Sequence, residues 1–211
     1  MNSKVKIKVC GMREPENIKE VANLYPDFLG LIFYPKSKRY VLDSEASLII
    51  NAIPDNICKV GVFVNEEISK VLEKIKMFNL DAVQLHGIES PAYCEELKIH
   101  GIEIIKAFGI DNDFNFRFTK DYVSSCSYFL FDTKSVNYGG TGVKFNWNKL
   151  YEYNNEKPVF LSGGLEANDA GIVKDIKDFN LYAVDLNSKF EIKPALKNIE
   201  LLKGFITELR K

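Results

Sequence analysis

The chain has 211 residues, 46% of them hydrophobic, and a formal net charge of −1 from 28 basic and 29 acidic side chains. This much apolar material can build a sizeable core and argues against disorder, and the balanced charge gives no electrostatic case for binding nucleic acid or an anionic membrane surface. No apolar run approaches the ~20 residues of a membrane span, and the first residues, MNSKVKIKV, alternate charged and apolar side chains, unlike a secretory signal.

Four cysteines are spread along the chain, and none belongs to a CxxC pair or to a spacing that holds a metal ion. They are Cys10, Cys58, Cys94 and Cys126. The two histidines, His86 and His100, also show no metal-ligand spacing. Neither a disulfide framework nor a metal site is expected, so the simplest interpretation is a reduced protein of the cytoplasm.

Strand-like and helix-like patterns alternate from one end of the chain to the other. Apolar runs predict eight strands at residues 5–10, 28–33, 58–63, 81–85, 102–108, 128–132, 158–162 and 181–186. Amphipathic patterns predict helices at residues 15–25, 66–78, 91–100, 168–179 and 194–210. The distances between successive strands suit one helix of about three turns and two short loops.

Strict alternation of strand and helix predicts a parallel sheet with right-handed crossovers. Eight such units favour closure into a (β/α)8 barrel, or TIM barrel, formed by residues 1–211 as a single α/β domain, although ~250 residues are typical of that fold. The alternative is an open, doubly wound sheet. No Gly-x-Gly-x-x-Gly motif follows the first strand, which weakens the dinucleotide-binding version of that alternative.

Polar or reactive residues, often followed by glycine, recur where the predicted strands end. Closure of a parallel barrel brings these carboxyl ends to one rim, and in this fold that rim carries the chemistry. The rim positions considered below are Cys10, Arg39, His86, Asp132, Gly163, Gly164, Asn187 and Ser188.

The stretch FDTKSVNYGGTGVKFNW at residues 131–147 is the most informative part of this rim. An apolar strand ends abruptly on Asp132. The loop that follows contains Gly139, Gly140 and Gly142, and such glycines let backbone N–H groups approach a ligand closely. A carboxylate at the end of an apolar strand is costly unless it is paired or has a function. In an apolar pocket its pKa is raised, so Asp132 is a candidate proton donor; the alternative is a strand-ending acid before a flexible turn.

Cys10 is a second candidate for proton transfer. It directly precedes Gly11 and lies shortly before a predicted helix start at Pro15, and helix N-termini favour the thiolate form. The alternative is a small buried hydrophobe, which is the usual role of cysteine and the one expected for the other three. Lys8 has the same strand parity as Cys10 and should point into the barrel, where it needs a carboxylate partner. Asp185 on the last strand is the expected one.

Further rim residues are candidates for substrate contacts. Arg39, in the loop after the second strand, offers a fork that grips a carboxylate, unless it is simply solvated. His86 lies at a rim position where a ligand contact is plausible. Phosphate usually docks after strands seven and eight of such barrels. The candidates there are Gly163, Gly164, Asn187 and Ser188.

Together these residues resemble a known family. The matching segments are KVCGM (8–12), SKRYV (37–41), VGVFVN (60–65), DAVQLHG (81–87), FDT…GGTG…FNW (131–147), LSGGL (161–165) and VDLNSKFE (184–191). In this order they are similar to segments of phosphoribosylanthranilate isomerase of tryptophan biosynthesis. The resemblance covers nearly the whole chain, and QLHG and the Asp-Thr…Gly-Gly-Thr-Gly…Trp cluster are its specific parts.

The resemblance implies a (β/α)8 barrel that catalyses, without a cofactor, the Amadori rearrangement of N-(5-phosphoribosyl)anthranilate to 1-(2-carboxyphenylamino)-1-deoxyribulose 5-phosphate. It implies that Cys10 is the general base, that Asp132 is the general acid, and that Arg39 faces the carboxylate of anthranilate. The loops after strands seven and eight would hold the phosphate. The implied partner is this phosphosugar–anthranilate substrate, and the implied assembly is a monomer or a homodimer.

The chain departs from the family pattern mainly at the phosphate end. Lys38 stands where a proline is usual, and Ser-Lys-Phe-Glu at 188–191 stands where Ser-Gly-Val-Glu is usual. Pro-Ala-Leu-Lys-Asn at 194–198 replaces the usual Pro-Gly…Lys-Asp. Lys189, which stands where the Ser-Gly-Val-Glu motif usually has glycine, could add a positive charge near the phosphate.

Two other kinds of function stay open on the sequence. A different phosphosugar barrel enzyme would share the phosphate end, but an indole-forming synthase needs a catalytic lysine and glutamate on the rim, and a sugar-phosphate epimerase needs more metal-binding histidines. A non-catalytic metabolite-binding barrel would bind ligand without turnover. The presence of both Cys10 and Asp132 disfavours it.

Overall fold

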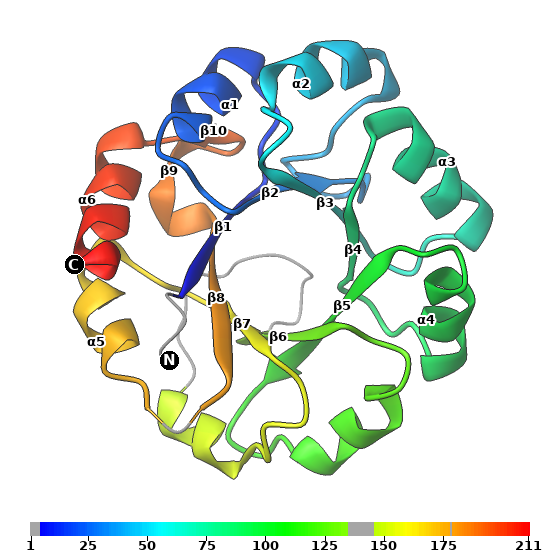
Figure 1. Cartoon of the computed structure of the whole chain (residues 1–211), viewed down its shortest axis with the longest axis vertical. Coiled ribbons are helices and arrows are strands. Elements are labelled where there is room, and N and C mark those ends of the chain that lie inside the picture. The colour runs from blue at the N-terminus through cyan, green and yellow to red at the C-terminus, as the bar shows by residue number, and fades with distance from the viewer. Residues whose placement is uncertain (1–4, 135–145, 178) are drawn as a thin grey trace.

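Eight parallel strands close into a barrel in the order in which they occur along the chain. The computed structural model describes residues 5–134, 146–177 and 179–211. The strands are β1 (Lys6–Cys10), β2 (Phe28–Ile32), β3 (Cys58–Phe63), β4 (Ala82–Leu85), β5 (Glu103–Ile110), β6 (Tyr128–Thr133), β7 (Val159–Leu161) and β8 (Leu181–Leu186). Because β1 pairs with β8 as well as with β2, the sheet has no open edge, and the doubly wound alternative is wrong. Figure 1 shows this barrel along its axis.

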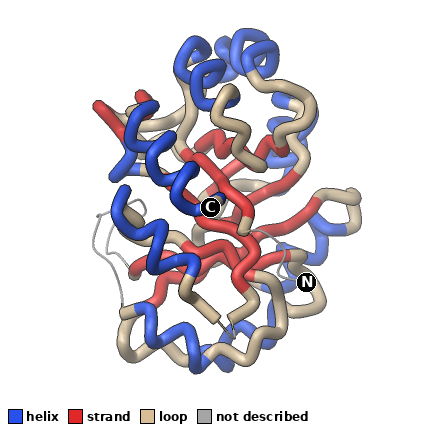
Figure 2. The backbone as a smooth tube through the Cα atoms, turned by 60° about the vertical axis from the view of Figure 1, so that its left-hand side comes forward, coloured by secondary structure: helices blue, strands red, loops and turns tan. Residues whose placement is uncertain are grey.

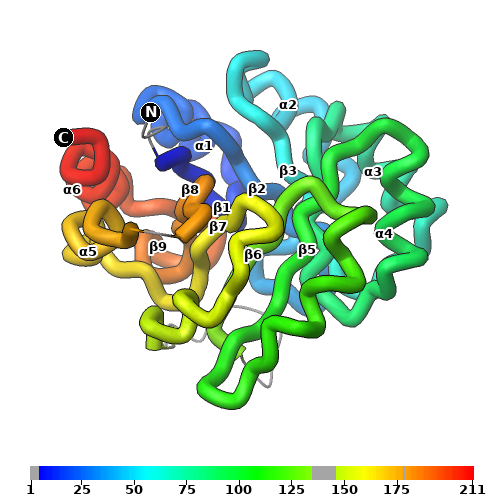
Figure 3. Tube along the Cα trace, turned by 60° about the horizontal axis from the view of Figure 1, so that its bottom comes forward, coloured from blue at the N-terminus to red at the C-terminus, as the bar shows by residue number. Residues whose placement is uncertain are grey.

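Helices surround the barrel and cover its outer face (Figures 1 and 2). The α-helices are α1 (Pro15–Ala22), α2 (Ala46–Ala52), α3 (Ile68–Phe78), α4 (Pro91–Lys98), α5 (Ala170–Lys174) and α6 (Ile199–Arg210). The 3-10 helices are η1 (Asp43–Glu45), η2 (Phe116–Tyr122), η3 (Trp147–Glu152), η4 (Ala167–Asp169) and η5 (Ser188–Phe190). Helix α6 lies between α5 and α1 and contacts both, which completes the outer ring (Figure 3). No helix of the described ranges has the length and apolar character needed to cross a membrane.

The predicted strands are all confirmed, with bounds that differ by at most two residues. The helices were harder to predict, because α2 and the 3-10 helices η2 and η3 are short and lack a long apolar stripe. The prediction of helix at residues 194–198 is wrong. Ala195 has a left-handed φ of +68°, and β9 (Glu191–Lys193) pairs there with β10 (Leu196–Lys197) in an antiparallel hairpin. The helix begins only after Asn198, whose side chain accepts a hydrogen bond from the N–H of Leu201.

The interior of the barrel is apolar at one end and polar at the other. Its apolar layer consists of Phe28, Val60, Ala82, Ile105, Ala107, Leu130, Phe160 and Ala183. Side chains two residues apart on a strand point to the same face. Gln84, Asp132 and Asp185 each lie two residues beyond a member of this layer, so they point inward nearer the carboxyl ends. The apolar layer supports the barrel, and the polar residues above it form the floor of a site.

The β9–β10 hairpin ties the end of the barrel to the first helix. The side chain of Asn17 on α1 accepts a hydrogen bond from the N–H of Lys197 at 2.6 Å and donates one to the Lys197 carbonyl at 3.1 Å. Both residues are buried. A segment that follows β8 is therefore fixed to a helix that follows β1, close to the rim where Cys10 lies.

Candidate active site

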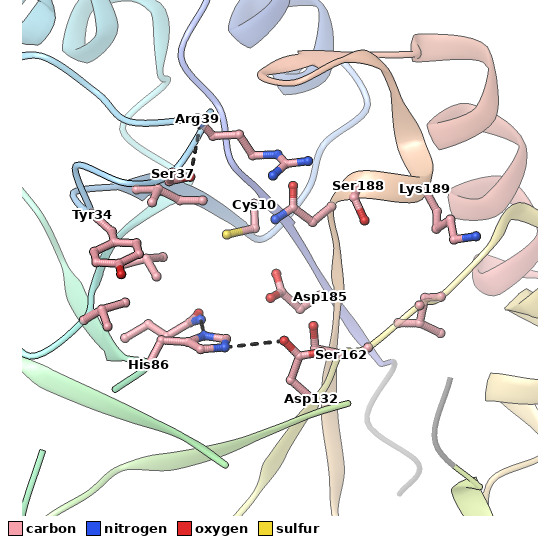
Figure 4. A pocket seen from close by; sticks show the side chains of 18 residues that line it. Cys10, Tyr34, Ser37, Arg39, His86, Asp132, Ser162, Asp185, Ser188 and Lys189 are labelled. Atoms are coloured by element: carbon pink, nitrogen blue, oxygen red, sulfur yellow. Dashed lines mark hydrogen bonds and ion pairs between the residues drawn. The ribbon is translucent and has the colours of Figure 1, made fainter. Parts of the chain in front are cut away.

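A pocket opens at the carboxyl ends of the strands, and most of the residues predicted from the sequence line it (Figure 4). The predicted residues that line it are Cys10, Arg39, His86, Asp132, Gly163, Gly164, Asn187 and Ser188. Gly140, the remaining predicted residue, lies outside the described residues. Sequence reasoning did not select Tyr34, Ser37, Gln84 or Ser162, which also line the pocket.

Cys10 lies at the end of β1, with its side chain almost completely buried. It pairs with Gly30 of β2, where an added Cβ would lie 2.7 Å from the Cys10 Sγ. Only glycine therefore leaves room for the thiol. Burial raises the pKa of Cys10, an effect that the nearby ammonium groups of Lys8 and Lys197 oppose. The thiolate predicted from a helix N-terminus is thus not the preferred resting form, and the cations that favour it are two buried lysines.

Lys8 is fully buried inside the barrel and is bound as the strand parity predicts. Its Nζ lies 2.8 Å from Asp185 Oδ1 and donates to Gln84 Oε1 at 2.7 Å. Burial acts to lower the pKa of Lys8, but the charge of Asp185 and the interaction with Cys10, which contributes a charge only when it is ionised, outweigh it, so the pKa is raised and the side chain is a cation. The expected partner, Asp185, is confirmed.

Asp132 is the penultimate residue of β6 and lies in surroundings that are more polar than the sequence suggests. Its Oδ1 accepts a hydrogen bond from the N–H of Thr133 at 2.8 Å. Its Oδ2 lies 3.4 Å from His86 Nε2, as the dashed line in Figure 4 marks. The side chain is 17% exposed to the pocket. One oxygen therefore accepts from a backbone N–H and the other faces an imidazole nitrogen, whereas an apolar environment was expected, and the carboxyl group stays accessible to a ligand.

Arg39 reaches the pocket but is held by a glutamate that the sequence analysis did not select. Its Nε lies 2.8 Å and its terminal nitrogen 2.6 Å from the two oxygens of Glu191, a bidentate contact. Glu191 Oε1 also accepts from Lys197 Nζ at 2.7 Å, and Lys197 donates to Asn187 Oδ1 at 2.8 Å. Burial lowers the pKa of Lys197 to about 8, against the opposing attraction of Glu191. Two cations thus share one carboxylate beside the pocket.

The loops after β7 and β8 bring the predicted phosphate residues together. Gly163 and Gly164 have left-handed φ values of +87° and +73°, which side chains other than glycine rarely adopt. Among described residues, no protein acceptor takes their backbone N–H groups. Lys189, which also lines the pocket, forms an ion pair of 2.8 Å with Glu166. Ser188 begins a single 3-10 turn, and no longer helix starts there.

No group of three histidine, cysteine, aspartate or glutamate side chains gathers to hold a metal ion in residues 5–134, 146–177 and 179–211. The pocket instead brings together a thiol, a carboxyl group, an imidazole and an arginine. These groups can exchange protons with a ligand and pair with anions.

A closed (β/α)8 barrel with such a pocket at the carboxyl ends of its strands has the architecture of a TIM-barrel enzyme. The family model of N-(5'-phosphoribosyl)anthranilate isomerase matches residues 7–208. The chain belongs to this family, and it is an isomerase of tryptophan biosynthesis.

Individual relatives agree with this assignment. The N-(5'-phosphoribosyl)anthranilate isomerase of Parabacteroides distasonis is 44% identical over 207 residues, which cover 96% of this chain and 92% of the relative. A crystal structure of phosphoribosylanthranilate isomerase in complex with reduced 1-(o-carboxyphenylamino)-1-deoxyribulose 5-phosphate is 32% identical, with a TM-score of 0.84 and coverage of 97% and 98%. Monomers of the dimeric enzyme from Thermotoga maritima are 31% identical, with a TM-score of 0.83 and the same coverage.

Proposed function

We propose that this pocket isomerises N-(5'-phosphoribosyl)anthranilate to 1-(2-carboxyphenylamino)-1-deoxyribulose 5-phosphate, with Cys10 as general base and Asp132 as general acid. The observation that carries the proposal is their placement. Cys10 ends β1, Asp132 is the penultimate residue of β6, and both side chains line the same pocket. A base and an acid that face one ligand from different strands suit a reaction in which a proton leaves one atom and another is added elsewhere.

The proposed steps balance without a cofactor. Asp132 donates a proton to the ribose ring oxygen, the C1′–O bond breaks, and the nitrogen lone pair forms a Schiff base at C1′. The fraction of Cys10 that is ionised to thiolate removes the proton from C2′, and the electron pair moves to give an enolamine. The enolamine then relaxes to the ketone by losing the hydroxyl proton at C2′ and gaining one at C1′. Each assisted proton transfer is typically worth about 10²–10⁴-fold in rate.

Arg39 is proposed to bind the carboxylate of the anthranilate ring. Arg39, Lys197 and Glu191 together carry a net charge of +1 when all three are ionised, which attracts an additional anion. The guanidinium is half-buried and already oriented by Glu191. A substrate carboxylate therefore meets a rigid cation, and little side-chain entropy is lost on binding.

The phosphate is proposed to bind between the loops after β7 and β8. Among the described residues, nothing accepts from the backbone N–H groups of Gly163 and Gly164, and backbone donors in a glycine turn form concave anion sites. Asn187, Ser188 and Lys189 line the same pocket. His86 lies beside Asp132, with its Nε2 3.4 Å from Asp132 Oδ2, and is proposed to contact the substrate near this acid. Binding at both anionic ends would position the sugar between Cys10 and Asp132.

Turnover of freshly prepared phosphoribosylanthranilate, followed by the loss of anthranilate fluorescence, tests this proposal. We expect Asp132→Asn and Cys10→Ser each to lower kcat by at least ~10²-fold, the low end for losing a proton-transfer group, with little change in the affinity for a product analogue. Cys58→Ala is the matched control. Cys58 is half-buried and begins β3, at the end of the barrel opposite to the pocket. Near-wild-type turnover in either variant would remove that residue from its role, and ligand binding without any turnover would favour a non-catalytic barrel.

The assembly proposed is a monomer or a homodimer, because the Thermotoga maritima relative is described as dimeric and also as monomers. Light scattering at micromolar concentration distinguishes the two states. A cytoplasmic location and the absence of nucleic-acid binding stay predictions from the sequence.

A further inference from the structure

A chain of polar side chains crosses the barrel from β8 to β6 beneath the pocket. Asp185 on β8 contacts Lys8 on β1, and Lys8 contacts Gln84 on β4. Gln84 Nε2 lies 2.8 Å from His86 Nδ1, and His86 Nε2 lies 3.4 Å from Asp132. Figure 4 shows the last contact, between His86 and Asp132, as a dashed line. Within this hydrogen-bonded series, each side chain determines which atoms of the next one donate and which accept.

The direction of the amide of Gln84 is decided by Lys8. An ammonium group has three donors and no acceptor, so the Gln84 atom at 2.7 Å from Lys8 Nζ must be the carbonyl oxygen. The NH₂ group therefore faces His86. Both Lys8 and Gln84 are at most 1% exposed, so water does not offer the amide an alternative partner. A rotation of the amide by 180° would place two donors against each other in a buried site, which is costly.

The amide in turn decides which nitrogen of His86 carries the proton. An NH₂ group donates, so Nδ1 must accept and carries no hydrogen. A neutral imidazole then has its single N–H at Nε2, which is the nitrogen that faces Asp132 Oδ2. A proton on Nδ1, in a neutral or a charged ring, would point at the NH₂ group. Lys8 and Gln84 thus disfavour every form of His86 except one.

The backbone that carries His86 is fixed as firmly as its ring. The N–H of His86 donates to the Phe63 carbonyl at 2.8 Å. In the loop that follows, Glu89 accepts from the N–H of Gly87, and Lys106 donates both to Glu89 at 3.0 Å and to the Gly87 carbonyl at 2.8 Å. Lys106 and Glu89 are buried. The backbone of His86 is therefore held by hydrogen bonds, and the tautomer of its ring is set by Gln84.

From this geometry we propose that Gln84 is a positioning residue that fixes His86 as the Nε2–H tautomer, a hydrogen-bond donor to Asp132. The inference rests on the proposed role of Asp132. When Asp132 gives its proton to the ring oxygen it becomes a carboxylate, and the Nε2–H of His86 is already directed at that charge. The ring cannot take the proton itself, because its other nitrogen is occupied by Gln84. Asp132 therefore exchanges the proton with the substrate, and His86 stabilises the anion left behind.

The inference is tested by ¹⁵N NMR of the histidine rings, which identifies protonated and unprotonated nitrogens. The chain contains only two histidines and one glutamine, and His100→Gln, in the exposed turn after α4, assigns the His86 signals. In the wild-type protein we expect His86 to have an unprotonated Nδ1 and a protonated Nε2. A proton on Nδ1 at neutral pH would overturn the inference without any measurement of activity.

The variant Gln84→Glu is the sharpest perturbation, because it is nearly isosteric and replaces the NH₂ donor by an acceptor. We expect the proton of His86 to move to Nδ1, and kcat to fall on the order of 10²-fold, as for the loss of one preorganised donor, with KM nearly unchanged. Gln84→Met, which removes both polar atoms, should give a mixture of tautomers and a smaller loss. Retention of the Nε2–H tautomer in Gln84→Glu, or wild-type kcat with a reversed tautomer, would overturn the inference.

The two proposals fail in different ways. If Asp132→Asn keeps wild-type turnover, the proposed acid is wrong, whatever tautomer His86 adopts. If Asp132→Asn is inactive and His86 carries its proton on Nδ1 in the wild type, the acid stands and the role of Gln84 is wrong.

Discussion

At the scale of single residues, Cys10 is subject to two opposing effects. Burial raises its pKa above the ordinary value of 9.0, and the cations of Lys8 and Lys197 lower it. The net direction is upward, so the neutral thiol predominates at pH 7 and the thiolate fraction rises with pH up to the raised pKa. The substrate's phosphate and carboxylate do not help this ionisation, and the two buried lysines are the groups that do.

Alkylation of Cys10 by iodoacetamide should therefore accelerate with pH and continue to accelerate beyond pH 9, because only the thiolate reacts. The rate is measured by mass spectrometry of the peptide that contains Cys10, which separates it from the other three cysteines. Cys10→Ser gives the background. A plateau of the rate near neutral pH would contradict the raised pKa and would indicate a thiolate in the resting enzyme.

Arg39 is the second residue whose role depends on its partners. Lysine has a point charge and cannot reproduce a bidentate contact, so Arg39→Lys should weaken product-analogue binding by roughly tenfold, equivalent to about 1.4 kcal/mol. The change in kcat should be smaller than the change in KM. Arg13→Lys is a suitable control, since Arg13 lies in the loop after β1 and pairs with its neighbour Glu14. An unchanged KM in Arg39→Lys would leave Arg39 only its structural contact with Glu191.

At the scale of elements, the turn after β7 is built so closely against the end of β6 that one side chain cannot be added. A Cβ at Gly163 would lie 2.5 Å from the backbone nitrogen of Thr133 and 3.0 Å from Asp132 Oδ1. The turn that should receive the phosphate therefore also sets the position of the acid. Binding of the substrate phosphate and proton transfer by Asp132 are therefore coupled through the contact of Gly163 with the end of β6.

Gly163→Ala should consequently raise KM and lower kcat together, because the left-handed φ and the close approach both resist a side chain. In the wild-type enzyme, inorganic phosphate should compete with substrate. Gly171→Ala in α5 is the matched control, since nothing lies within 4 Å of an added Cβ there. If Gly163→Ala changed neither parameter, or if phosphate did not compete, the phosphate would have to bind elsewhere.

At the scale of the whole molecule, closure of the barrel brings β8 beside β1, and the buried pair of Lys8 and Asp185 lies on that seam. Removing one member leaves the other charge buried without its partner, which typically costs about 3–5 kcal/mol. The contact that orients Gln84 is lost in the same step. The stability of the fold and the arrangement of the site therefore share one interaction.

Lys8→Met should lower the free energy of unfolding by about 3–5 kcal/mol, measured by urea denaturation at pH 7. Lys6→Met is the comparison, because Lys6 lies on the same strand two residues earlier, is half-buried and donates to the neutral Tyr182 hydroxyl. Its effect should be clearly smaller. Equal losses in the two variants would show that the buried ion pair contributes no more than ordinary packing of the lysine stem.

Much of the fold and part of the site could be predicted because they depend on local patterns. Eight apolar runs at regular spacing specify the strands, and the parity of each strand places Lys8 and Cys10 on its inner face. Residues at strand ends, such as Asp132 and His86, meet at the rim of any closed parallel barrel. The helix at 194–198 was wrong because the pattern there is too short to distinguish a hairpin from a first helical turn.

The sequence by itself determined the barrel, the rim residues and the family, because all three follow from the order of elements and from motifs within a few residues of each other. Only the tertiary structure decided the partners of those residues. Arg39 and Glu191 are 152 positions apart, and Lys8 and Gln84 are 76 apart. Hydrogen-bond direction, burial and the resulting pKa of Cys10 depend on which distant side chains converge, and strand closure sets that convergence.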